Sequence, residues 1–184
     1  MKLPRAFIAV FRWLGLVALA LALGFARVEA ATLVWTNTAG GGWHRAANWE
    51  PNQIPGADDF AVITNAGSYS VVLDGDAVAA GFVVGESVGG GTQMLGLNGF
   101  TLTVSGPGVV NPRGWLLLDR GTFSSSGTNT IAGRCDWGGA ALTGAGTLEI
   151  AAGATLYVEN AERDRKSTRL NSSHPRLSRM PSSA

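Results

Sequence analysis

Cysteine and histidine are scarce in this 184-residue sequence, which contains one cysteine and two histidines. The single cysteine, Cys135, excludes an intramolecular disulfide. We expect it to be a small core residue beside Trp137, because no histidine lies nearby to activate its thiol. His44, the only histidine before residue 164, is expected to form hydrogen bonds in a loop. Ser87 is the centre of a Gly-x-Ser-x-Gly sequence, but it lacks the strong strand and following helix that expose a nucleophilic serine.

Lysine is absent from residues 31–163. In this range five arginines stand against eleven aspartates and glutamates, so the formal net charge is −6, whereas the whole chain has a formal net charge of +1. An acidic protein does not attract nucleic acids or anionic membranes. We therefore expect neither of them as a partner.

Long apolar runs are absent except for residues 13–23. Three basic residues precede this run, and the small-residue sequence Val-Glu-Ala precedes Ala31, as at a signal-peptide cleavage site. The alternative, a membrane anchor, needs roughly 20 apolar residues, and Arg27 ends the region too early. We predict that residues 1–30 are a signal peptide that engages the export machinery transiently, and that the mature protein is extracellular or on the outer cell surface.

Glycine and apolar periodicity both disappear after residue 163. Residues 164–184 have the composition of a disordered basic tail. Back-translation of this stretch also resembles a sequencing-library adapter in one continuous reading frame. We therefore treat it as a non-native, disordered tail, exclude it from fold prediction, and expect the natural protein to continue beyond Arg163.

Helical spacing is missing from the remaining sequence, which instead repeats short apolar runs between glycines. Apolar and small polar residues alternate within several runs, as on a pleated strand with one buried face. Strands this short bury their apolar face only when successive coils stack on one another. The sequence therefore predicts an all-β fold, a parallel β-solenoid whose incomplete series of coils spans residues 60–163. The clearest predicted strands are 32–36, 58–63, 69–73, 78–84, 93–97, 100–104, 115–118, 121–123, 129–131, 141–143, 146–150 and 153–158.

Residues 31–59 differ from the repeats because they contain three tryptophans, Trp35, Trp43 and Trp49. Large aromatic side chains cover much apolar area, so they suit a cap over the open end of a solenoid core. We predict such an N-terminal cap, with residues 43–49 as one helical turn or a loop. The alternative is that the three indoles are exposed and stack on glycan rings.

The order of Trp35, Gly-Gly-Trp43, Asn-Trp49, Pro-Gly56 and Asp59, followed by Gly-x-Leu-x-Val repeats, resembles the N-terminal region of large secreted bacterial β-solenoid proteins. These are adhesin-like proteins of the autotransporter-passenger type. The resemblance implies a right-handed β-helix that acts as a surface or secreted scaffold, often without catalysis in this segment. The usual C-terminal barrel or sorting signal of such proteins is not found in this sequence, so the resemblance leaves the route of export open.

Carboxylate pairs are the remaining candidates for chemistry, because β-helical polysaccharide lyases and hydrolases use acidic residues on one face. Asp58 and Asp59 are adjacent, so a strand would point them in opposite directions, and they could act as a pair only if the strand starts after them. Asp74 and Asp76 flank a glycine, where aspartate commonly bonds to backbone amides of a turn. Calcium needs six or more oxygen ligands, more than this turn supplies. We assign no catalytic, cofactor or metal site.

Three functions are compatible with these features. We favour a non-enzymatic structural or adhesive segment of a larger exported protein, with surface glycans or other extracellular proteins as partners. The alternatives are the N-terminal part of a carbohydrate-active β-helix enzyme and a carbohydrate-binding module. A scaffold predicts small polar faces, whereas an enzyme predicts a groove with clustered Asp, Arg or Lys. Threonines that fit an exposed ladder are Thr101, Thr103, Thr122, Thr130, Thr143, Thr147 and Thr155.

Overall fold

A computed structural model describes residues 30–159. The chain divides into two units, residues 1–30 and 31–184, and the description below concerns the second. The predicted tail, residues 164–184, and all of the predicted signal peptide except Ala30 lie outside the described residues.

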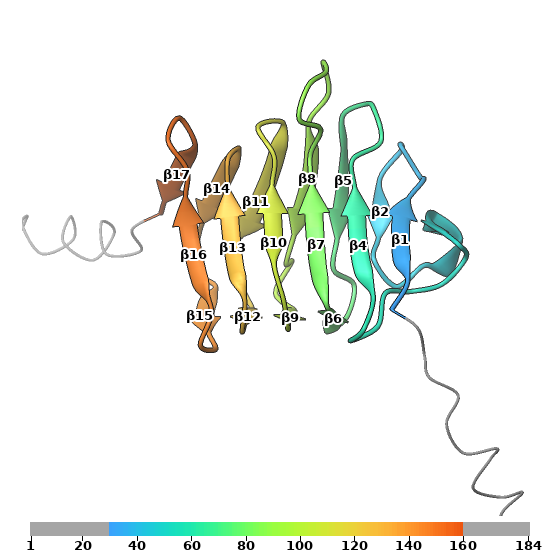
Figure 1. Cartoon of the computed structure of the whole chain (residues 1–184), viewed down its shortest axis with the longest axis horizontal. Helices are drawn as coiled ribbons and strands as arrows, with labels where there is room; N and C mark the ends of the chain where they lie inside the picture. The colour runs from blue at the N-terminus through green and yellow to red at the C-terminus, as the bar shows by residue number, and fades with distance from the viewer. Residues whose placement is uncertain (1–29, 160–184) are drawn as a thin grey trace, which may run out of the picture. The chain divides into compact units, whose positions relative to one another are not determined.

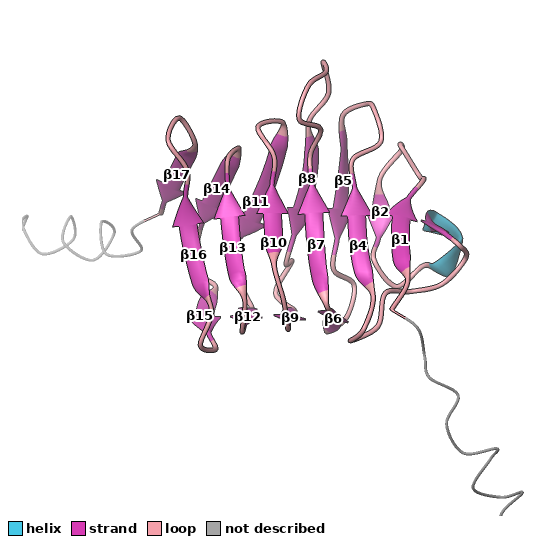
Figure 2. Cartoon of the chain, viewed as in Figure 1, coloured by secondary structure: helices cyan, strands magenta, loops and turns pink. Residues whose placement is uncertain are grey.

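The described residues form β-strands, turns and a single 3₁₀ helix (Figure 2). The helix, η1, spans Ala46–Asn48, inside the segment for which the sequence predicts a helical turn or a loop. The strands are β1 Thr32–Trp35, β2 Gly41–Gly42, β3 Trp49–Glu50, β4 Phe60–Ile63, β5 Tyr69–Val72, β6 Ala77–Ala79, β7 Gly81–Val84, β8 Gln93–Gly96, β9 Thr101–Val104, β10 Gly108–Val110, β11 Gly114–Leu118, β12 Thr122–Ser125, β13 Thr128–Ile131, β14 Arg134–Trp137, β15 Ala141–Thr143, β16 Thr147–Ile150 and β17 Thr155–Val158.

The strands stack into three parallel sheets, which run side by side along a β-solenoid of about five turns (Figure 1). Sheet A has the order β16-β13-β10-β7-β4-β1-β3, sheet B the order β17-β14-β11-β8-β5-β2, and sheet C the order β15-β12-β9-β6. Each full coil contributes one strand to each sheet, and every third strand is therefore a neighbour. The predicted all-β solenoid is confirmed.

The core is built from aligned stacks of inward side chains, because successive residues of a strand point to opposite faces. In sheet B, the strand register aligns one inward-facing residue of each coil with an inward-facing residue of the next coil, and these residues form one such stack. Its members are Val71, Leu95, Leu116, Cys135 and Leu156. The first four have no solvent exposure. The core is thus continuous from coil to coil.

Large and small side chains alternate where sheet A meets sheet C. The ring of Phe82 lies at right angles to that of Phe123, with centroids 6.2 Å apart. Gly108 on β10 is the register partner of Phe82 on the neighbouring strand β7. A Cβ atom at Gly108 would overlap the Phe82 ring. Glycine at this position therefore makes room for the aromatic pair.

Two departures from the predicted strands have local causes. Residues 78–84 are not one strand, because the chain turns from sheet C to sheet A between β6 and β7. Four further strands, β2, β3, β10 and β14, lie outside the predicted runs. A glycine in β10, and the alternating charged residues Arg134 and Asp136 in β14, conceal their strand character.

Candidate functional site

The tryptophan cap closes the first coil from inside. Trp35, Trp43 and Trp49 have no solvent exposure. Trp49 packs edge-on against Trp35 and Trp43, with ring centroids 5.1 and 4.9 Å away. Its indole N–H donates to the backbone oxygen of Trp43 at 2.8 Å. The three indoles are therefore buried in the cap that the sequence predicts.

Asn48 ties the cap to the first strand. Its side-chain amide donates to the backbone oxygen of Gly42 at 3.1 Å, and its own backbone oxygen accepts from the amide of Thr36 at 2.8 Å. β3, which follows directly, pairs with β1 in the only antiparallel arrangement among the described strands. The Asn-Trp sequence is thus the point where the chain crosses the end of the solenoid.

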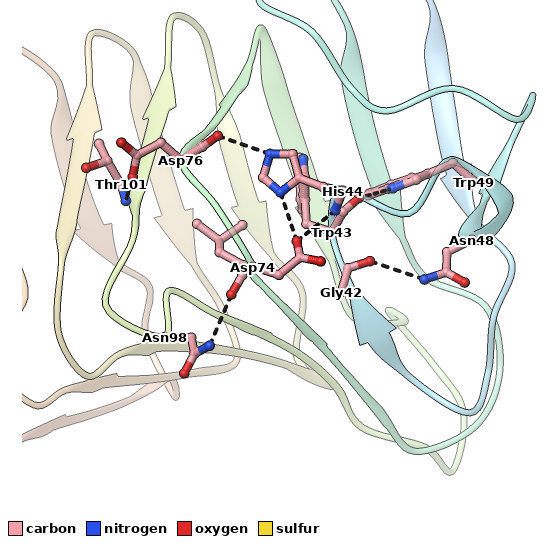
Figure 3. Close-up of polar contacts among 10 residues, drawn as sticks. Gly42, Trp43, His44, Asn48, Trp49, Asp74, Asp76, Asn98 and Thr101 are labelled. Atoms are coloured by element: carbon pink, nitrogen blue, oxygen red, sulfur yellow. Dashed lines mark hydrogen bonds and ion pairs between the residues drawn. The ribbon is translucent and has the colours of Figure 1, made fainter.

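A polar corner lies where the chain passes from sheet B toward sheet C, and it contains His44, Asp74 and Asp76 (Figure 3). Oδ1 of Asp74 accepts from the backbone amide of His44 at 2.9 Å and lies 2.8 Å from the ring Nδ1. The other ring nitrogen, Nε2, lies 3.0 Å from the backbone oxygen of Asp76. Burial acts to raise the pKa of Asp74, but the hydrogen bonds from His44 outweigh it, so the pKa falls below its ordinary value.

The same corner recurs in the next coils. Oδ1 of Asp76 accepts from the amide of Thr101 at 2.8 Å, and Oδ1 of Asp119 accepts from the amide of Asn98 at 3.1 Å. Asn98 in turn donates to the backbone oxygen of Leu73 at 3.2 Å (Figure 3). Each side chain satisfies a backbone group of a neighbouring coil. The corner therefore holds coils together. Asp74 and Asp76 accept from backbone amides, as the turn interpretation predicts, but these amides belong to His44 and Thr101 in other coils rather than to the same turn.

The two adjacent aspartates differ in burial, but strand alternation is not the reason, because β4 begins at Phe60, after both of them. Asp58 is exposed, whereas Asp59 is 3% exposed and accepts three hydrogen bonds. Burial opposes the charge on Asp59, but bonds from Gly56, Ala31 and Gln53 lower its pKa below the ordinary value. The two carboxylates do not form a pair for acid–base chemistry.

Cys135 and Ser87 have opposite environments. Cys135 is fully buried, and burial followed by the nearby charge of Asp136 raises the pKa of its thiol to about 11. Ser87 is exposed in the loop between β7 and β8, so the element that follows it is a strand and not a helix. Neither residue has the surroundings of a nucleophile.

The predicted threonine ladder is wrong as a single feature, because the seven threonines are divided among three sheets. Register, rather than spacing in sequence, decides which residues share a face. Thr101, Thr103, Thr122 and Thr143 belong to sheet C, Thr130 and Thr147 to sheet A, and Thr155 to sheet B.

A shallow groove on the outer face of sheet B was not predicted. Its volume is about 390 Å³, and its lining is Thr92, Pro112, Arg113, Gly114, Trp115 and Arg134. The Arg134 guanidinium carbon lies 4.3 Å from the centre of the Trp115 ring, a cation–π arrangement. Arg134 also donates from Nε to Asp136 at 2.7 Å. The indole nitrogen of Trp115 is buried and has no hydrogen-bond partner within residues 30–159.

The groove was missed because its residues come from three consecutive coils. Trp115 and Arg134 are neighbours only through the register of β11 and β14. A sequence signal was available in the outward positions, where Met94, Trp115 and Arg134 stand at one register position of consecutive coils. This signal can be recognised only when the number of residues in each coil is known, and that number varies along the chain.

Within residues 30–159 no cluster of three or more His, Cys, Asp or Glu side chains is arranged to hold a metal ion. No helix in the same range has the length and apolar character needed to cross a bilayer.

No protein-family model, curated protein or solved structure matches the chain.

Proposed function

We propose that the chain is a non-enzymatic structural or adhesive β-solenoid segment of a larger exported bacterial protein. The observation that carries this proposal is the difference between the two ends of the coil stack. At one end the indoles of Trp35, Trp43 and Trp49 are buried, and the antiparallel strand β3 covers the edge of β1. Such an end is complete by itself.

The other end is open within the described residues. β15, β16 and β17 each pair with a neighbour on one side only. Large apolar side chains are exposed there, namely Leu142, Ile150, Leu156, Tyr157 and Val158, at 38 to 58%. An exposed apolar edge favours a further strand layer. A further coil of the same kind would bury these side chains and extend the scaffold.

The chemistry of the coils also supports a scaffold. The carboxylates of Asp59, Asp74 and Asp76 accept hydrogen bonds from backbone amides of other segments. These groups therefore stabilise the stacking of coils, which is the property a passive rod requires.

Export and continuation are tested separately. The full chain with a C-terminal tag is expressed in a Gram-negative host, and the processed form is expected outside the cytoplasm. Leu19→Arg, in the apolar run, is expected to keep the chain unprocessed in the cytoplasm. Retention of the unaltered chain in the cytoplasm would contradict the proposal.

Continuation is checked by sequencing the natural gene beyond codon 163. We expect additional Gly-Thr-Leu coils in frame. A natural stop codon directly after Arg163 would contradict the proposal that the segment belongs to a longer solenoid.

The groove of sheet B favours a second candidate function, the binding of an anionic glycan. Guanidinium groups pair with carboxylates, and an indole offers an apolar surface for a sugar ring. Arg113, which has no ion pair among the described residues, and Trp115 bring both elements into one groove, whereas Arg134 is already paired with Asp136. This candidate retains the predicted carbohydrate-binding alternative but places it on Trp115 rather than on the tryptophans of the cap.

Titration with oligogalacturonate, followed by tryptophan fluorescence, tests this candidate. Binding is expected to weaken about tenfold or more in Arg113→Ala, which removes one charge-assisted contact. A neutral oligosaccharide of equal length and the variant Arg45→Ala, an exposed arginine near the cap, serve as controls. Equal affinity of the Arg113→Ala and Arg45→Ala variants would refute the assignment.

A further inference from the structure

The backbone nitrogen of Ala31 lies against a buried carboxylate. It donates to Oδ1 of Asp59 at 2.9 Å. The other oxygen, Oδ2, accepts from the amide of Gly56 at 2.9 Å and from the side chain of Gln53 at 3.0 Å. Asp59 is only 3% exposed, and Ala31 is partly buried against the core.

Among the described residues, Asp59 has three hydrogen-bond donors but no cation. Within residues 30–159 no ion pair involves this carboxylate. A buried charge is expensive unless hydrogen bonds and an opposite charge compensate for it. The donors are all neutral, so the charge itself is uncompensated among the described residues.

The position of Ala31 in the sequence connects the Asp59 carboxylate with the predicted signal-peptide cleavage. The sequence predicts cleavage between Ala30 and Ala31. Cleavage there would convert the Ala31 amide into an α-ammonium group. The hydrolysed bond yields the carboxylate of Ala30 and the amine of Ala31, which takes up a proton at neutral pH.

We propose that Asp59 is the binding site for the α-ammonium group of the mature protein, which begins at Ala31. The atom that donates at 2.9 Å would carry the positive charge, so processing replaces a neutral donor with a counter-ion. Because Asp59 directly precedes β4 and Ala31 directly precedes β1, the pair fastens the first coil to the second. The proposal depends on the cleavage included in the proposed function and is independent of adhesion or glycan binding.

The arrangement is selective for one cleavage position. A chain that retained Ala30 would place a neutral amide at the Asp59 contact and its ammonium one residue away. A chain that began at Thr32 would lack the donor. Signal-peptide removal at a neighbouring bond therefore would not create the pair.

Competitive labelling with trace acetic anhydride measures this pair directly, because the processed chain contains two primary amines, the α-amine and Lys166. Lys166 is an internal reference. The mature chain, residues 31–184, is produced by secretion and also by cleavage of a cytoplasmic fusion that leaves Ala31 first. The pKa of each amine follows from its labelling rate as a function of pH.

We expect the α-amine pKa to lie at least about one unit above its ordinary value of about 7.7 to 8.0, because a carboxylate contacts it. Asp59→Asn is expected to remove this rise, whereas Asp58→Asn, the same change at the exposed neighbour, is expected to leave it. A chain with Ala30 retained keeps Asp59 intact and is expected to show the ordinary value. It provides the comparison if Asp59→Asn does not fold.

Two results would overturn the proposal. One is a secreted chain whose first residue, by N-terminal sequencing, is not Ala31. The other is an α-amine pKa that is equal in chains beginning at Ala30 and Ala31. The fusion-derived protein separates the outcomes, since a failure of export leaves its α-amine measurement unaffected.

Discussion

At the residue scale, Asp59 and Cys135 are titratable side chains that the fold withdraws from solvent. Their environments act in opposite ways. Hydrogen bonds favour the charged form of Asp59, whereas burial favours the neutral form of Cys135. The environment of Asp59 can therefore be measured through the pH dependence of stability, and that of Cys135 through its reactivity toward a thiol reagent.

Asp59→Asn should reduce stability at neutral pH and make the protein less sensitive to acid. The pKa of Asp59 is lowered in the folded state, so its stabilising effect is present above the ordinary value near 3.8 and is lost as pH falls through the lowered folded pKa. We expect a loss of about 2 kcal/mol at pH 7. Urea denaturation at pH 7 and at pH 3 measures both effects. Asp58→Asn, at the exposed neighbour, should change little at either pH.

The Cys135 thiol should be unreactive in the native protein. Its pKa of about 11 leaves very little thiolate at pH 8, and the side chain has no solvent exposure. Incubation with an aromatic disulfide reagent is expected to give no reaction over hours in buffer and one equivalent within minutes in urea. Rapid native labelling would show that the last coils open readily.

At the element scale, corners and the cap determine how coils meet. Gly99 and Gly121 occupy similar corners after β8 and β11, with φ values of 89° and 87°. A Cβ atom at Gly99 would meet nothing within 4 Å, whereas one at Gly121 would overlap the backbone oxygen of Phe100. A comparison of the same substitution at Gly99 and Gly121 therefore distinguishes the cost of backbone strain from the cost of a clash between coils.

Gly121→Ala should therefore be more destabilising than Gly99→Ala. Alanine in the left-handed region costs about 1 to 2 kcal/mol at either position. The clash with the coil below is expected to add at least about 1 kcal/mol at Gly121. Urea midpoints of the two variants provide the measurement, and equal midpoints would mean that the coils separate at little cost.

Trp49 is the centre of the cap, so its removal should weaken the protein strongly. Trp49→Ala is expected to cost about 3 to 5 kcal/mol, because it removes a buried indole and two aromatic contacts. Unfolding is followed by far-UV circular dichroism, which does not depend on the missing chromophore. Ile54→Ala, at a side chain 37% exposed, should stay within about 0.5 kcal/mol of the unaltered protein.

At the scale of the whole molecule, the open edge should cause self-association. Leu156 extends the core stack beyond Cys135 and is 43% exposed. We expect sedimentation coefficients to rise with concentration, and Leu156→Lys to suppress this rise because a charge discourages edge pairing. Val88→Lys, in a loop whose valine is 81% exposed, is the control. Equal association of both variants would argue against the edge as the contact.

The solenoid itself was predictable, because alternation within short runs and the glycines between them are local properties. The cap was predictable for a similar reason, since tryptophans such as Trp43 gather in one segment. The groove was not, because Trp115 and Arg134 meet through register. Coil length sets that register, and it is determined by tertiary packing rather than by any single run.

The corner turns absorb differences in coil length without disturbing the sheets. Val62 and its partner Val83 are 21 residues apart, Phe82 and its partner Gly108 are 26 apart, and Thr128 and its partner Thr147 are 19 apart. The loop between β7 and β8 projects outward beside its neighbours (Figure 1). Such a loop can accept a peptide epitope or a small inserted domain while strand pairing is preserved. The molecule thus provides a scaffold with regular spacing between strands, from which loops of different size can project.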